Sequence, residues 1–230
     1  MTPLQDHALL SLWEHALPLP WPAREALFAG FDNAAPAHTL GAQRLRVLAL
    51  HRRVSGAALP LRCQCPACGE GLGFEVDLDA LAAALPEPPA GAQTLALEGR
   101  EWRFRLPAPD DVAAADTPDV EAFVQRLAAR CVLDEEAPLP ASVVAALAER
   151  IETLDPAAAL SFTVACPACA HAWDAAFDPA RTLWAFVQTH AEQTLLDVDV
   201  LARRYGWTEA EVLALSPTRR RAYLQLADGG

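Results

Sequence analysis

The sequence contains no lysine, so all 18 of its basic residues are arginines. This absence excludes chemistry that requires a lysine amine, such as Schiff-base catalysis or the phosphate contact of a P-loop. There are 30 acidic residues, and the formal net charge is −12 at pH 7. Nucleic-acid binding depends largely on cationic groups that neutralise phosphates. We therefore expect no nucleic-acid partner.

Long apolar runs are also missing. No stretch of about 18 apolar residues occurs, and the first residues have neither the basic start nor the apolar segment of a secretory signal. We therefore expect a cytoplasmic protein that makes no membrane contact. The cytoplasm keeps thiols reduced, which favours metal binding over disulfides for paired cysteines.

The sequence also lacks common catalytic motifs. It contains no Gly-x-Ser-x-Gly, no His-Glu-x-x-His and no convincing acid–base pair. The chain has 230 residues and 53% apolar content, which is enough for a substantial core. We expect a folded protein that is not an enzyme and has no small-molecule substrate.

One four-residue motif occurs twice, as Cys65-Pro-Ala-Cys68 and Cys166-Pro-Ala-Cys169. The similarity continues beyond the cysteines, where Leu72 corresponds to Trp173 and a strand-like segment follows each motif. Two such knuckles supply the four thiolates of a tetrahedral structural zinc site. We predict one shared zinc ion, with Cys65, Cys68, Cys166 and Cys169 as its ligands.

The spacing between the two motifs leaves alternatives open. Cys68 and Cys166 are 98 positions apart, whereas a compact zinc ribbon has roughly 15 to 20 residues between its pairs. Either a large insertion splits one site, or two partial sites form, with Cys63 beside the first and His171 beside the second. A redox role is disfavoured because both motifs lead into strands and not into a helix. Cys131 is expected to be a small buried apolar residue.

Apolar periodicity predicts helices at about 4–16, 23–30 and 41–54, and strands beside both motifs. A further hairpin is expected around Glu98-Gly99-Arg100. We expect these strands to form one small antiparallel sheet that carries both knuckles. The predicted fold class is α+β and mostly helical, with helical N- and C-terminal segments.

The region between the knuckles is acidic. Residues 107–160 hold 11 acidic residues and three arginines, and helices are expected at about 118–132, with Thr117 as its N-cap, and at 141–154. Helix N-termini and solvated faces account for most of these acids, and a docking surface for a basic partner is the alternative. The predicted segments are an N-terminal helical segment (1–56), a first knuckle with hairpin (57–109), an acidic insert (110–159), a second knuckle (160–178) and a C-terminal helical segment (179–230).

The C-terminal segment has clear helix signals. A long helix at 180–204 ends near Gly206, and Thr208 with Glu211 forms a capping box before the next helix. This corner also has the spacing of a helix-turn-helix, so a DNA-binding regulator is the alternative function. Glu209 and Glu211 would begin the recognition helix, however, and their carboxylates would face phosphates.

Arg219 and Arg220 stand near the start of the last predicted helix, where positive charge opposes the helix dipole. They are either solvated or paired with Glu209 and Glu211, or they belong to a surface that binds another protein. Arginine and aromatic residues commonly dominate interface energetics. The predicted partner-binding residues are Tyr205, Trp207, Arg219, Arg220 and Tyr223.

Several segments together resemble one family. They are Leu12-Trp-Glu14, Arg24-Glu-Ala-Leu27, Leu40-Gly-Ala-Gln-Arg44, both knuckles with their following strands, Leu106-Pro with Asp110-Asp-Val112, and the tail from Asp199 to Leu224. Through them the chain resembles the baseplate protein, or baseplate hub assembly chaperone, of T-even-type contractile phage tails. The nearest pattern is that of versions encoded in bacterial phage-tail-like contractile injection clusters. One departure is Ala170, where glycine is common.

The resemblance spans nearly the whole chain, and the Tyr-Gly-Trp and Ser-Pro-x-Arg-Arg tail is its most specific part. It implies a non-enzymatic role in building the hub and baseplate of a contractile particle. The protein would act as a transient chaperone or as a minor structural component. The implied partners are baseplate, hub and tail proteins.

Overall fold

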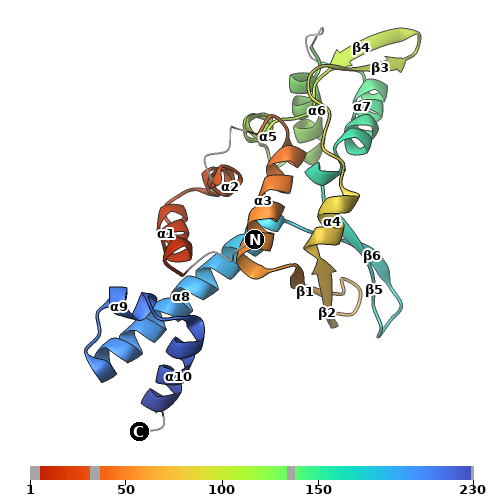
Figure 1. The fold of residues 1–230 in the computed structure, drawn as a ribbon. Helices are drawn as coiled ribbons and strands as arrows, with labels where there is room; N and C mark the ends of the chain where they lie inside the picture. Colours follow the sequence, from red (N-terminus) through yellow and green to blue (C-terminus); the bar gives the residue numbers. More distant parts are fainter. Residues whose placement is uncertain (1–5, 32–36, 134–137, 229–230) are drawn as a thin grey trace. The chain divides into compact units, whose positions relative to one another are not determined.

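The computed structural model describes residues 6–31, 37–133 and 138–228 (Figure 1). The chain divides into two compact units. The smaller consists of Met1–Pro20 with Arg181–Gly230, and the larger of Trp21–Ala180. The described residues are mixed α+β, as predicted, with small two-stranded antiparallel sheets. None of the described helices combines the length and apolar character that a bilayer span requires.

The larger unit alternates helices with hairpins. Its helices are α2 (Trp21–Ala29), α3 (Leu40–Ser55), α4 (Leu78–Ala84), α5 (Pro109–Ala115), α6 (Val120–Cys131) and α7 (Ala141–Leu154). Its strands are β1 (Ala58–Gln64), β2 (Gly71–Asp77), β3 (Gln93–Leu97), β4 (Arg100–Phe104), β5 (Ser161–Ala165) and β6 (Ala172–Ala176). The short helices α4 and α5 were not predicted.

The prediction of one shared sheet is wrong. In the described residues β1 pairs only with β2, β3 with β4, and β5 with β6, each pair antiparallel. Other helices cover the apolar face of the β3–β4 hairpin, and the two knuckle hairpins meet through side chains such as Phe74 and Phe162 and not through a shared ladder. The β3–β4 hairpin packs on α6 and α7, whereas the two knuckle hairpins pack beside α3 and α4.

The β3–β4 hairpin turns at the predicted position. Glu98 and Gly99 both have positive φ, 53° and 78°, as a two-residue type I′ turn requires. Trp102 and Phe104 on β4 are buried against α6 and α7. The amide of Arg105 donates to the carbonyl of Cys131 at 2.9 Å, so the hairpin and the acidic insert share one core.

Cys131 is fully buried in this core, as the helical pattern predicted. Burial raises the pKa of its thiol to about 11. The N-cap of α6, in contrast, is Asp119 and not Thr117. A carboxylate oxygen of Asp119 accepts from the amides of Glu121 at 3.0 Å and Ala122 at 3.3 Å.

The end of the insert returns to the start of α3. Thr39 caps α3 by accepting from the amide of Ala42, and the carboxylate of Asp155 accepts from the amide of Gly41 at 3.0 Å. A β-carbon at Gly41 would lie 1.5 Å from Asp155 Oδ1, so only glycine permits this approach. Asp155 is 1% exposed, and burial raises its pKa. Asp155 is therefore not among the solvated acids of the insert.

The smaller unit is helical. It contains α1 (Asp6–Ala16), most of α8 (Pro179–Tyr205), α9 (Glu209–Leu213) and α10 (Pro217–Asp228). The capping box of Thr208 and Glu211 is confirmed, and Gly206 has a positive φ of 71°. Segments from the two halves of the sequence thus fold together.

Asp111 at the start of α5 organises a charged cluster inside the larger unit. Its side chain is 3% exposed and accepts from the guanidinium groups of Arg105 and Arg130, as well as from the amide of Ala108 at 2.9 Å. The hydrogen bonds from Arg105 are the main cause that lowers the pKa of Asp111 to about 2. The cluster joins the end of β4 to α5 and α6.

We expect Asp111→Asn to lower the free energy of unfolding by roughly 2 kcal/mol at pH 7, because a buried charge-assisted cluster loses its acceptor. The pKa of Asp111 is lower in the folded state than in the unfolded state. Its contribution is therefore complete above the unfolded value of about 4, and is lost as the pH falls toward about 2. The difference in unfolding free energy between wild type and Asp111→Asn, called the deficit below, should therefore shrink as the pH falls over that interval.

Urea denaturation across this pH range measures the deficit. The matched control is Asp110→Asn, which alters an exposed neighbour in the same helix. Any loss of stability common to all variants in acid cancels in that comparison. Equal unfolding free energies for Asp111→Asn and Asp110→Asn at pH 7 would contradict the prediction.

Candidate metal centre

Each knuckle is a tight turn between two strands of a hairpin. In the first, the amide of Cys65 donates to the carbonyl of Glu70, and the amide of Gly69 donates to the carbonyl of Cys65, both at 2.9 Å. In the second, the amide of Cys166 donates to the carbonyl of His171, and the amide of Ala170 donates to the carbonyl of Cys166, again both at 2.9 Å. The repeated sequence thus folds into a repeated backbone structure.

The two knuckles meet at their cysteines. Sγ of Cys65 lies 3.7 Å from Sγ of Cys169, and Sγ of Cys68 lies 3.6 Å from Sγ of Cys166. All four sulfurs lie within 4.8 Å of one another. These separations exceed a disulfide bond of about 2.05 Å. They are close to the edge of about 3.8 Å in a sulfur tetrahedron with 2.3 Å metal–sulfur bonds.

The prediction of one shared four-cysteine group is therefore confirmed. In the described part of the chain it is the one group of three or more potential ligands that converges on a common point. Cys65 and Cys166 are each 2% exposed, whereas Cys68 and Cys169 are exposed. The group thus has a buried side and a side near the surface.

The backbone and the neighbouring thiols set the acidity of the group. Burial raises the pKa of Cys65, but the backbone hydrogen bonds from Ala67 and Cys68 and the adjacent thiols lower it to about 7. For Cys68 a backbone hydrogen bond at Glu70 lowers the pKa, whereas the thiols of Cys169 and Cys166 raise it to about 12. The acidity of Cys65 and of Cys68 therefore depends on the sulfurs around them.

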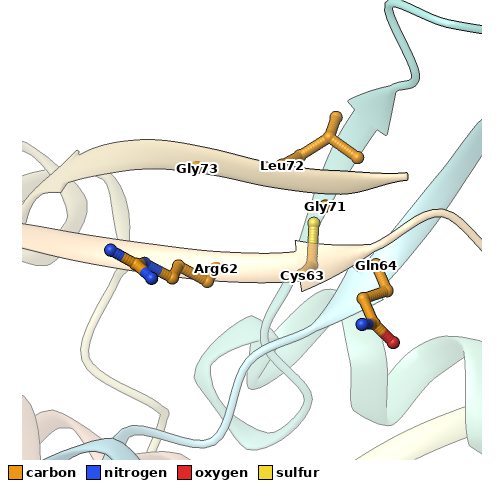
Figure 2. Close-up of a pocket in the computed structure, with 6 residues that line it drawn as sticks. All are labelled: Arg62, Cys63, Gln64, Gly71, Leu72 and Gly73. Carbon is orange, nitrogen blue, oxygen red and sulfur yellow. The ribbon is translucent and has the colours of Figure 1, made fainter. Parts of the chain in front are cut away.

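Cys63 and His171 do not belong to this group. Cys63 lies on β1 opposite Leu72 of β2, and it lines a shallow pocket with the glycines of β2. Figure 2 shows the Cys63 and Leu72 side chains on the same face of the hairpin. His171 is exposed and stacks on Trp173, with ring centroids 6.0 Å apart. The alternative of two partial sites has no support in this geometry.

The predicted partner-binding residues lie in the smaller unit. The ring of Tyr205 stacks on Trp207 at 4.8 Å between centroids, and Tyr223 meets Trp207 edge-on at 4.8 Å. Arg219 on α10 is exposed. The structure therefore brings the three aromatic rings into one cluster.

Arg220 is different from its neighbour. It is 5% exposed, and its Nη2 lies 2.7 Å from Oδ2 of Asp6, whose other oxygen lies 2.9 Å from Nε2 of His190. The guanidinium is thus inside the unit, and Arg220 is not available as a surface anchor. Sequence reasoning missed this ion pair because Asp6 comes from the opposite end of the chain.

Comparisons with protein-family models, with curated proteins and with solved structures find no match for this chain. The geometry of the four cysteines therefore carries the interpretation of the site. It shows a group that could hold a metal ion.

The two knuckles differ at the residue after the second cysteine, and this difference gives a prediction. Gly69 and Ala170 both have positive φ, 76° and 60°, a conformation that costs an L-residue roughly 1 kcal/mol. We expect Ala170→Gly to raise the free energy of unfolding by roughly 1 kcal/mol, and Gly69→Ala to lower it by a similar amount.

Chemical denaturation of both variants with metal content held constant measures these changes. No heavy atom lies within 4 Å of a β-carbon built at Gly69, so a steric clash does not confuse the comparison. If both substitutions change stability in the same direction, the backbone conformation is not the cause.

Proposed function

We propose that the four cysteines hold one structural zinc ion. A set of four thiolates with near-tetrahedral spacing suits zinc, and four protein ligands leave no open position for a substrate. The ion would join two hairpins that lie about a hundred residues apart in the chain. Its role is thus to fix their relative position, which the hairpins' own hydrogen bonds do not do.

Elemental analysis of protein purified without added metal should find about one zinc ion per chain. Cys68→Ser and Cys169→Ser should each remove the metal and destabilise the larger unit by several kcal/mol, because metal binding and folding are coupled. Cys63→Ser is the matched control, since Cys63 lies outside the group. Absence of zinc from the purified wild-type protein, together with unchanged stability of Cys68→Ser and Cys169→Ser, would disprove the zinc centre.

We further propose that the protein is a non-enzymatic assembly factor, or a minor component, of the baseplate or hub of a contractile tail-like particle. The observation that carries this proposal is the C-terminal segment. It holds the most specific part of the resemblance, its tyrosine and tryptophan side chains form one aromatic cluster, and Arg219, four residues before Tyr223 on the same helix, is exposed. Such a combination is typical of surfaces that bind proteins.

The DNA-binding alternative has weaker support. Helix α9 spans only five residues, Glu209–Leu213, which is short for a recognition helix. Both of its glutamates are exposed, and Glu211 is engaged in the capping box with Thr208. A duplex-binding assay at near-physiological salt tests this alternative directly. Tight binding with sequence preference would favour a regulator.

Arg219→Glu should reduce co-purification of hub or baseplate proteins by about tenfold or more, because a reversed charge disrupts an interface centre. Zinc content and thermal unfolding should stay unchanged, since Arg219 is exposed. Arg204→Glu, which changes another exposed arginine of the same unit, is the control. Normal partner capture and normal particle assembly with Arg219→Glu would refute this surface.

Arg220→Glu should differ from Arg219→Glu in thermal unfolding. The substitution places a second carboxylate against Asp6 in a buried position, so the smaller unit should unfold at lower temperature. If Arg220→Glu loses partner capture whereas Arg219→Glu keeps it, the loss therefore indicates a folding defect and not a disrupted interface.

A further inference from the structure

In the described chain neither knuckle hairpin pairs with a third strand, so the outer edges of its strands have no hydrogen-bonded neighbour strand, and the edges of β2 and β5 are the ones considered below. In the first hairpin the amide of Leu78 donates to Ala57, and that of Cys65 donates to Glu70. In an antiparallel ladder, opposite residues alternate between pairs that exchange hydrogen bonds and pairs that do not. The two bonds therefore fix which residues of β2 bond to β1. The amides and carbonyls of Gly73 and Glu75 consequently point away from β1.

The second hairpin follows the same rule. The amide of Phe177 donates to Leu160, and that of Cys166 donates to His171. The backbone groups of Thr163 and Ala165 on β5 therefore point away from β6. The outer edges of β2 and β5 thus both present alternating donors and acceptors.

The two open edges line one groove. Its volume is about 700 Å³, and β2, β5 and the start of α4 form its walls. Phe74 of β2 meets Phe162 of β5 edge-on, with centroids 5.8 Å apart, and Leu81 of α4 adds apolar surface. Pro167 of the second knuckle also lines the groove, so the metal centre adjoins it.

The charge along this groove has one sign. Glu75 and Asp77 line it and are exposed, and none of the described lining residues is basic. Gly73 has no side chain and Ala165 carries only a methyl group, which leaves the backbone edges accessible. An anionic ligand is therefore disfavoured, whereas a cationic one would be attracted.

We propose that this groove binds an extended, basic segment of a partner protein, which adds to the open edge of β2 as a further strand. An extended polypeptide matches a donor and acceptor pattern that repeats every second residue, whereas a helix has already used its own backbone groups. Apolar side chains of the segment contact Phe74, Phe162 and Leu81. Lysine or arginine side chains pair with Glu75.

The length of the edge sets the length of the segment. From Gly73 to Asp77 the strand spans five residues, or about 16 Å. A segment of similar length satisfies the free backbone groups of this edge. The inference rests on the proposed zinc centre, because the metal holds the two hairpins together, but it does not require the partner to be a tail protein.

The test uses a fluorescein-labelled ten-residue peptide in which valine and lysine alternate, and fluorescence anisotropy with the zinc-loaded full chain. We expect saturable binding that weakens by about tenfold in Glu75→Arg, since one attraction becomes a repulsion. Glu101→Arg is the matched control, because it makes the same charge change on an exposed strand residue of the β3–β4 hairpin. A valine–glutamate peptide should show the opposite preference and bind Glu75→Arg better than wild type.

Backbone pairing is tested separately from charge. N-methylation of alternate amides in the valine–lysine peptide should abolish binding without any change to the protein. Gly73→Pro should do the same from the protein side, because the amide that it removes points away from β1 and is not part of the β1–β2 ladder. Zinc content and thermal unfolding establish whether the Gly73→Pro variant is folded. If the variant is not folded, the methylated peptide still tests backbone pairing with the wild-type protein.

Several results would overturn the proposal. Equal binding of the methylated and unmethylated peptides would exclude backbone pairing, and equal effects of Glu75→Arg and Glu101→Arg would exclude the groove as the site of charge recognition. Tight binding of a single-stranded oligonucleotide that competes with the peptide would indicate a nucleic-acid ligand. A further contrary result is a wild-type dimer that Glu75→Arg dissociates. The last would mean that a second copy covers the groove. Zinc-loaded protein without peptide binding would reject the groove and leave the metal centre intact, whereas zinc-free protein would reject both.

Discussion

The convergence of four sulfurs is the constraint that brings the two knuckles of the larger unit together. Each knuckle hairpin is a two-stranded ribbon, and such ribbons are marginally stable alone. Cys65 approaches Cys169, and Cys68 approaches Cys166, so each knuckle contacts the other through both of its cysteines. A bound metal would turn these contacts into bonds and hold the open edges of β2 and β5 on either side of one groove.

The long insertion between the knuckles is compatible with this constraint because it closes on itself. The β3–β4 hairpin and helices α6 and α7 share a core of their own, centred on Phe104 and Leu147. Asp155 then accepts a hydrogen bond from Gly41 at the start of α3, the helix that precedes the first knuckle. The hydrogen-bonded return at Asp155 removes much of the freedom that so long a loop would otherwise have.

The smaller unit is organised by charge as well as by apolar packing. Asp6 holds His190 of α8 and Arg220 of α10 through its two carboxylate oxygens, and Arg220 is almost fully buried. Two adjacent arginines thus have opposite roles, since Arg219 is exposed and Arg220 is internal. The division follows from helix geometry, in which neighbouring residues point about 100° apart.

The sequence by itself indicated the four cysteines of the candidate metal centre, the hairpin turn at Glu98-Gly99 and the capping box at Thr208, because each depends on residue types at fixed short spacing. It also indicated most helices, since apolar periodicity is a local property. Only the tertiary structure decided that the strands form separate hairpins, that Asp155 is buried at the start of α3, and that Arg220 pairs with Asp6. These features join residues far apart in the chain, and no local pattern encodes which distant residue will meet a given side chain.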